Sequence, residues 1–167
     1  MNLLTGEVSR MLFGEGRLPA VVRRLLEEAQ AAPPAQREAL LWTARASAPD
    51  SLAVYYLLYK HYATQGEVLE AERAARKGLA EAARQAGLAA DWKRVLITQA
   101  DFAQPGPARF WLFTLKALAF LRLRAGGVHE ARELLAKLKE LDPQDSVGGD
   151  VVKALAEATA PKRRRKI

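Results

Sequence analysis

The stretch from Leu112 to Pro143 constrains the fold more than any other part of the chain. Its apolar residues recur at helical spacing on both sides of a glycine pair: Leu115, Leu118 and Ala119 precede Gly126-Gly127, and Ala131, Leu135 and Leu138 follow it. Asp142-Pro143 then stops the second pattern. Neither helix can bury its apolar stripe alone, so each must pack on neighbours. The stretch therefore predicts a helical hairpin within a larger stack of helices.

The rest of the sequence has the same character. Glycine and proline divide it into segments of about 10–20 residues, the usual length of globular helices. The segments are rich in Ala, Leu, Glu, Arg and Lys, which are strong helix formers. Hydrophobic residues make up 50% of the 167 residues, enough for one sizeable core. We predict an all-α domain over residues 1–160 and a disordered tail over 161–167.

The helix, glycine turn and helix occur twice. Aligning Gly66 with Gly126, an offset of 60 residues, places Tyr55 over Leu115 and Glu70-Ala71 over Glu130-Ala131. A step back of about 34 residues adds a more degenerate first unit that closes at Pro49, as the last closes at Pro143. The predicted units are residues 18–51, 52–85 and 112–145.

These units resemble the tetratricopeptide repeat family. The third unit carries the resemblance best, through Leu118-Ala119, Gly126, Ala131 and Leu141-Asp142-Pro143. The sequence departs from the family pattern at Leu115, where the family often has Trp, at Arg122, where it has Tyr, and at Tyr59, where it has a small residue. The resemblance implies a right-handed α-α superhelix, a solenoid of helical hairpins.

Two segments fall outside the repeats. The 60-residue offset exceeds one repeat, so residues 86–111 are expected to form an insertion, with an added helix that ends before Pro105. Residues 146–160 predict a short capping helix with Asp150 as its N-cap. The first residues, up to Gly16, are expected to form a short helix and not a secretory signal.

The resemblance also implies a binding groove, because the first helices of such repeats line the concave face. The matching positions are Tyr56, Lys60 and Thr64 in the second unit and Phe113, Lys116, Phe120 and Arg124 in the third. Aromatic rings interleaved with positive charge suit a peptide or helix with apolar anchors and acidic groups. Two alternatives stay open, that the inserted helix or the chain's own N-terminus fills this groove. Tyr55, Tyr59 and Tyr62 share another face and are expected in the core.

The net charge of +7 comes mostly from one short segment. Five of the 26 basic residues are Lys162, Arg163, Arg164, Arg165 and Lys166, so the rest carries 21 basic against 19 acidic residues, or +2. Such a tail could contact phosphates, although cations alone give weak, salt-sensitive binding. No aromatic residue lies among them to stack on bases.

No catalytic, metal or cofactor site is predicted. The segment His129-Glu-Ala-Arg-Glu133 lacks the second histidine of a zinc-protease helix, and His129 and His61 are expected to be solvent-exposed. The chain has no cysteine, and its longest apolar run is shorter than the ~20 residues of a membrane span. We therefore expect a cytoplasmic protein.

These observations favour a non-enzymatic adaptor that binds a segment of another protein in the groove. A secretion-type chaperone with the same repeats is a specific variant. The alternatives are an RNA- or ribosome-associated factor that uses the basic tail, and a homodimer formed through an exposed stripe of Phe110, Trp111 and Phe113.

Overall fold

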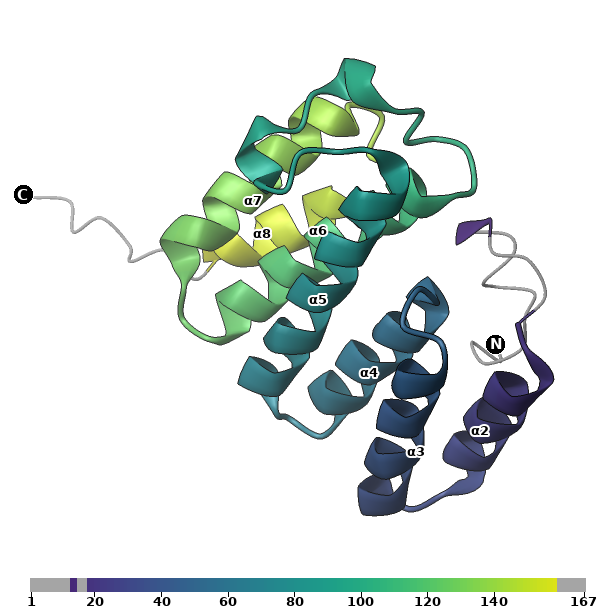
Figure 1. Ribbon diagram of the computed structural model, residues 1–167. Helices are drawn as coiled ribbons and strands as arrows, with labels where there is room; N and C mark the ends of the chain where they lie inside the picture. Colours follow the sequence, from purple (N-terminus) through teal and green to yellow (C-terminus); the bar gives the residue numbers. More distant parts are fainter. Residues whose placement is uncertain (1–12, 15–17, 159–167) are drawn as a thin grey trace, which may run out of the picture.

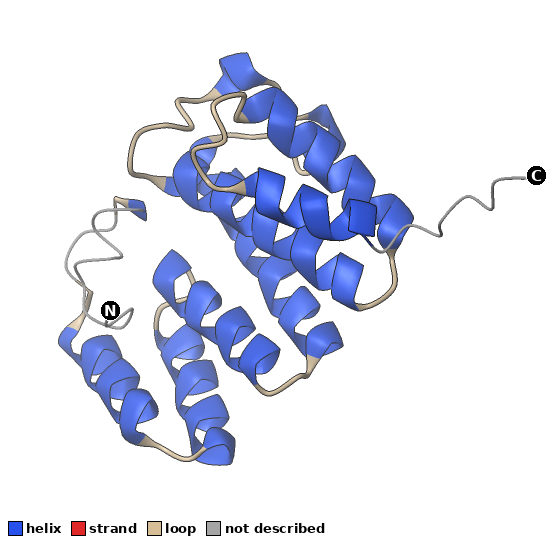
Figure 2. Cartoon of the chain, turned by 180° about the vertical axis from the view of Figure 1, so that it is seen from behind, coloured by secondary structure: helices blue, strands red, loops and turns tan. Residues whose placement is uncertain are grey.

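The computed structural model describes residues 13–14 and 18–158, and within these ranges the chain is helical without strands (Figures 1 and 2). The all-α class is confirmed. The α-helices are α2 (Ala20–Ala31), α3 (Pro34–Ser47), α4 (Leu52–Thr64), α5 (Val68–Ala86), α6 (Pro107–Arg124), α7 (Val128–Leu141) and α8 (Gly149–Ala158). Two short 3-10 helices, η1 (Trp92–Arg94) and η2 (Ile97–Gln99), lie between α5 and α6.

Helices that follow one another along the chain pack together. Three hairpins form, from α2 with α3, α4 with α5, and α6 with α7. They are joined by the packing of α3 on α4 and of α5 on α6, so the hairpins stack in chain order (Figure 1). At the C-terminal end α8 packs against both α6 and α7.

The turns at Gly66 and Gly126 have the same backbone conformation and the same hydrogen bonds. Gly66 and Gly126 have φ values of +75° and +86°, which favour glycine. Each donates its N–H to the carbonyl three residues earlier, at 3.1 Å in both turns. The next residue donates to the carbonyl five residues earlier, at 2.9 and 2.8 Å. These two bonds define a Schellman motif, which therefore ends both α4 and α6.

The predicted first unit ends as the last one does. The residue after α3, Ala48, has φ −143° and ψ 74°, and the residue after α7, Asp142, has φ −131° and ψ 63°. Both donate their N–H to the carbonyl four residues earlier. Since a proline follows each of them, both helices stop in the same way.

The apolar stripes predicted from the sequence form the core. Tyr55, Tyr59 and Tyr62 are 3–4% exposed, and Leu115 and Leu118 are fully buried. On α5 the buried residues are mostly small: Ala71, Ala74, Ala75, Gly78, Ala82 and Ala83. A side chain at position 78 would place its Cβ 2.9 Å from Cβ of Tyr55. The close approach of α4 and α5 therefore depends on the absence of a side chain there.

The insertion does not contain the expected α-helix. Residues between α5 and α6 form η1 and η2, and aspartate side chains accept hydrogen bonds from backbone N–H groups at two points of this segment. Asp91 Oδ1 accepts from Lys93 N, and Asp101 Oδ1 accepts from Ala103 N, both at 3.0 Å. Val95 is fully buried, and its carbonyl accepts a bond from Lys137 Nζ of α7 at 3.1 Å.

Two helix boundaries differ from those expected. Helix α6 begins at Pro107 rather than at residue 112, since proline is favoured in the first turn of a helix. Helix α8 begins at Gly149, so Asp150 lies in its first turn, and Asp145 Oδ1 accepts the Asp150 N–H at 3.1 Å. The short helix expected over the first residues lies outside the described residues, apart from Phe13 and Gly14.

The aromatic stripe proposed for a homodimer is not exposed. Phe110 is fully buried and Trp111 is 1% exposed, because Trp111 packs on Phe102 of the insertion, with ring centroids 6.0 Å apart. The expectation is therefore wrong for these two residues. None of the helices described here is long and apolar enough to cross a membrane.

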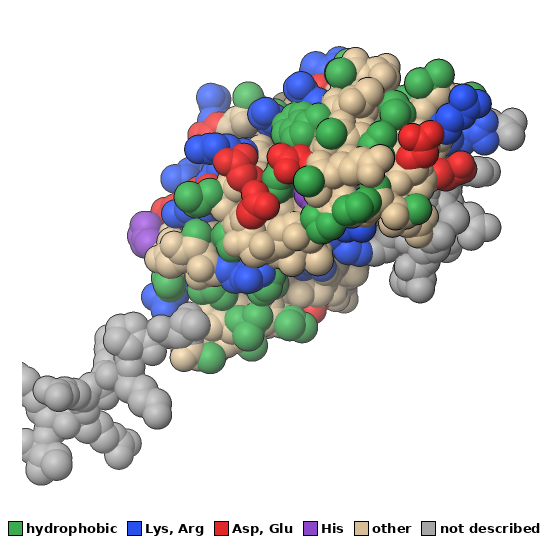
Figure 3. Space-filling view, turned by 90° about the horizontal axis from the view of Figure 1, so that it is seen from below, with side chains coloured by type: hydrophobic (Ala, Val, Ile, Leu, Met, Phe, Trp, Pro, Cys, Tyr) green, Lys and Arg blue, Asp and Glu red, His purple; other side chains and the backbone are tan. Residues whose placement is uncertain are grey.

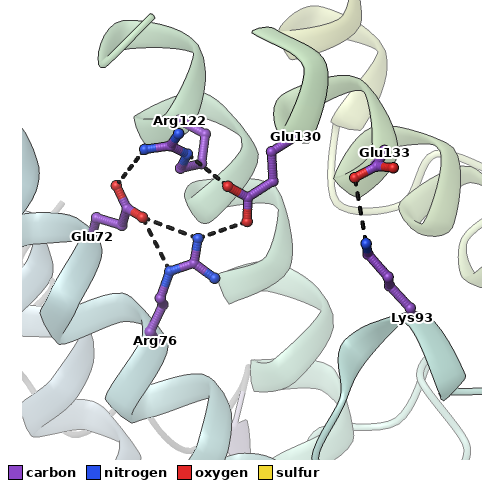
Figure 4. Close-up of polar contacts among 6 residues, drawn as sticks. All are labelled: Glu72, Arg76, Lys93, Arg122, Glu130 and Glu133. Atoms are coloured by element: carbon purple, nitrogen blue, oxygen red, sulfur yellow. Dashed lines mark hydrogen bonds and ion pairs between the residues drawn. The ribbon is translucent and has the colours of Figure 1, made fainter. Parts of the chain in front are cut away.

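Four charged side chains join α5, α6 and α7 (Figure 4). Arg122 NH1 lies 3.1 Å from Glu72 Oε2, and Arg122 Nε lies 2.9 Å from Glu130 Oε2. Arg76 NH2 closes the ring, at 3.0 Å from Glu72 Oε1 and 2.7 Å from Glu130 Oε1. The Glu72 side chain is only 13% exposed, and each of its two oxygens contacts an arginine.

We predict that Glu72→Gln lowers the free energy of unfolding by about 1 kcal/mol, since one network carboxylate is lost and partial solvent exposure screens the remainder. The matched control is Glu70→Gln, also on α5. The ion pair between Glu70 and Arg73 is largely exposed. The control variant should change stability by less than about 0.5 kcal/mol. Urea denaturation of both variants measures this, and equal effects would show that the network adds nothing beyond a surface pair.

Candidate functional site

The seven predicted groove residues lie on α4 and α6, which contact each other beside α5. Tyr56, Phe113, Lys116 and Phe120 are half-buried, and Lys60, Thr64 and Arg124 are exposed. The structure brings the two halves together at one point, where the rings of Tyr56 and Phe113 lie 5.9 Å apart. Tyr56 was expected to point away from the core tyrosines, but its ring makes an edge-on contact with Tyr59, with centroids 5.4 Å apart.

Cations lie over the rings of this surface. Lys60 Nζ is 5.7 Å from the centre of the Tyr56 ring, and Lys116 Nζ is 4.5 Å from that of Phe113. Arg124 Cζ is 5.8 Å from the Phe120 ring. Each pair is within the range of a cation–π contact. The aromatic and positive character predicted from the sequence is therefore realised as local pairs within each helix.

Phe13 lies at one end of the predicted groove. Phe13 is 2% exposed, and its ring lies 6.0 Å from Tyr56 and 6.3 Å from Phe113. It also makes an edge-on contact with Phe110 at 4.7 Å. The sequence left open whether the inserted helix or the N-terminus fills the groove, and Phe13 is the described residue that contacts the predicted groove positions.

Lys116 is already bound within the molecule. Its Nζ donates to the carbonyl of Val147, in the α7–α8 loop, at 2.6 Å. Burial lowers the pKa of this ammonium below its usual range. Lys116 therefore holds the capping helix against α6 and is not free to orient a partner. Thr64 is also used locally, since its hydroxyl donates to the Lys60 carbonyl at 2.8 Å.

Asp142 shapes the loop that presents this carbonyl. Its Oδ1 accepts from Ser146 N at 3.0 Å and Ser146 Oγ at 2.6 Å, and its Oδ2 accepts from Val147 N at 3.0 Å. Burial alone would raise the pKa of this carboxyl, but the hydrogen bonds outweigh it and the pKa is lowered. Sequence reasoning gave Asp142 only as a helix stop, whereas it also fixes the cap beside the groove.

A second aromatic and cationic cluster was missed. Trp42 of α3 is half-buried, with Lys77 Nζ 5.0 Å and Arg45 Cζ 5.8 Å from its ring. Its Nε1 donates to Tyr62 Oη at 2.7 Å, and Tyr62 donates to Glu38 Oε1 at 2.8 Å. Burial raises the pKa of Tyr62 to about 12. The cluster joins three helices, so no single periodic pattern reveals it.

The two histidines differ from each other. His129 has a 93% exposed side chain, as expected. His61 was expected to be exposed and is instead 6% exposed, because it lies on the inner part of α4 against Tyr62. Burial lowers the pKa of His61, which favours the neutral ring. Among the described residues no group of His, Asp and Glu could hold a metal ion. The basic residues 162–166 lie outside the described residues.

The chain is 29% identical over 164 residues to a protein of Azotobacter chroococcum mcd 1 described as an uncharacterized 19.8 kDa protein in the nifW 5′ region. The match covers 96% of this chain and 92% of that protein. No family model matches the chain, and no solved structure gives a significant match.

We predict that Asp142→Asn costs about 1–3 kcal/mol at pH 7, because the bonds to a charged acceptor are weakened and an amide NH₂ faces the Val147 N–H. A lowered carboxyl pKa stabilises the fold above the unfolded value of 3.8, and this contribution disappears as the pH falls through the lower folded value. Urea curves of the two chains should therefore converge in acid.

The control is Glu28→Gln on the exposed face of α2, which should leave the urea curve unchanged at both pH values. A gap between wild type and the Asp142 variant that is the same at pH 7 and pH 3 would contradict the proposed role of the carboxylate.

Proposed function

We propose that this protein is a non-enzymatic, helical-repeat adaptor that binds a segment of another protein along α4 and α6. The observation that carries the proposal is the row of half-buried aromatic rings with cations above them. The exposed part of a half-buried ring offers apolar surface to a ligand, and the protein does not have to open its core to present it. Lys60 and Arg124, the exposed cations of this row, would attract acidic groups on the same ligand. The repeated hairpins with equivalent Schellman turns support a tetratricopeptide-like arrangement.

The part of the groove that remains open lies toward the C-terminal ends of the two helices. Lys60 and Arg124 are exposed there, and Phe120 is half-buried. An incoming segment would bury an apolar side chain on Phe120 and place acidic groups near Lys60 and Arg124. Phe13 and the α7–α8 loop occupy the other positions, so this part would be the first contact.

The relative from Azotobacter chroococcum supports a conserved unit of this length but names no activity. Its match extends over nearly the whole of both chains. We therefore propose that the two proteins share the helical stack. A cytoplasmic location is part of this proposal, because the chain without cysteine suits a reducing compartment.

Nucleic-acid binding is not favoured by the folded part. On the face seen in Figure 3, basic and acidic side chains lie beside one another with small apolar patches between them. Such a mixed surface makes no strong field of one sign. The basic residues 162–166 are the alternative source of affinity for RNA.

We predict that Phe120→Ala together with Arg124→Ala lowers recovery of a specific partner protein by tenfold or more, because an apolar anchor and its cation are both lost. The measurement is affinity capture from the native cell with the wild-type chain and the variant as baits, followed by quantitative mass spectrometry.

The matched control is Leu69→Ala with Arg73→Ala on α5, which removes an apolar and a cationic side chain that are 61% and 71% exposed. A partner retained by the control and lost with the groove variant would support the proposal. A partner recovered equally by all three chains would refute the groove assignment.

A further inference from the structure

The Phe13 ring lies in a pocket with aromatic walls. Tyr56 of α4 and Phe110 and Phe113 of α6 surround it, at centroid distances of 6.0, 4.7 and 6.3 Å. The contact with Phe110 is edge-on, with an interplanar angle of 84°. These distances and angles are those that aromatic pairs prefer. The pocket is therefore well matched to a phenyl side chain.

The backbone around Gly14, the residue after Phe13, requires a glycine at that position. Gly14 has φ +65°, which disfavours a side chain. A Cβ at this position would lie 2.8 Å from the Pro105 carbonyl oxygen and 3.1 Å from Cα of Gly106. Both are backbone atoms, so no side-chain rotation can relieve the clash. The site thus accepts an aromatic residue followed by glycine.

The walls of the pocket are held in place without Phe13. Helices α4 and α6 both pack on α5, where Gly78 lies against Tyr55 and near Phe110. Tyr59 Oη and Thr114 Oγ1, 3.4 Å apart, add a second link between α4 and α6. A pocket whose walls are fixed by other contacts can exchange its occupant.

We propose that this pocket is a binding site for an aromatic-glycine segment of a partner protein, and that Phe13 is a resident occupant that the partner displaces. The proposal rests on the proposed adaptor function, since the pocket is the closed end of the same groove. It adds the chemistry of the ligand: a phenylalanine followed directly by glycine. Lys60, exposed beside Tyr56, favours an acidic residue nearby.

The test uses the full chain and a fluorescein-labelled peptide with the sequence of residues 8–18. Fluorescence anisotropy compares its binding to the wild-type chain and to Phe13→Ala. The variant should bind about tenfold or more tightly than the wild type, because the tethered Phe13 competes at a high effective concentration. Peptides with Phe13→Ala or Gly14→Ala are the matched controls and should lose this binding.

Equal affinity of the two chains, absence of binding to the variant, or binding that survives Phe13→Ala in the peptide would overturn the proposal. Circular dichroism accompanies the assay. A variant that loses its helical signal would show Phe13 to be an obligatory core residue and would overturn it as well. The peptide result does not depend on any cellular partner, so it separates this inference from the proposed function, whose own test is the capture experiment.

Discussion

The small-residue face of α5 is the constraint on which the structure depends. Helix α5 packs on α4 along one side and on α6 along the other, and alanine or Gly78 stands at most of its buried positions. At Gly78 a Cβ would come within 2.9 Å of the Tyr55 Cβ and 3.5 Å of the Phe110 ring. Large aromatic side chains on α4 and α6 can be buried only because α5 leaves room for them.

The groove follows from this packing. With α4 and α6 drawn onto the same helix, Tyr56 meets Phe113 and Tyr59 reaches Thr114. Other parts of the chain cover some of this surface. Phe13 contacts Tyr56 and Phe113, and the α7–α8 loop binds Lys116. A surface partly covered by its own chain is protected from non-specific association, and the proposed binding would select a ligand that can replace or extend that cover.

Local patterns allowed much of the fold to be predicted. The turns at Gly66 and Gly126, the buried tyrosines of α4 and the stripes of α6 and α7 all follow from helical spacing and glycine chemistry within a few residues. The family resemblance and the superhelix that it implies stay predictions.

The errors and omissions share a physical cause, which is contact between distant segments. The Val95 carbonyl of the insertion accepts a bond from Lys137 of α7, and Trp111 is buried by Phe102 of that insertion. The Lys116–Val147 bond and the contact of Phe13 with Phe110 join residues far apart in the sequence, so a helical repeat pattern does not predict them. Only three-dimensional packing decides which side of a half-apolar helix is covered.

The most direct measurement is the stability of Gly78→Ala in urea, compared with Ala80→Gly at an exposed position of the same helix. Glycine-to-alanine changes in exposed helix interiors normally stabilise by about 1 kcal/mol. If α5 must approach Tyr55 closely, Gly78→Ala should instead destabilise the protein, by about 1–3 kcal/mol, as overpacked cores do. Stabilisation by Gly78→Ala, equal and opposite to the cost of Ala80→Gly, would contradict this account.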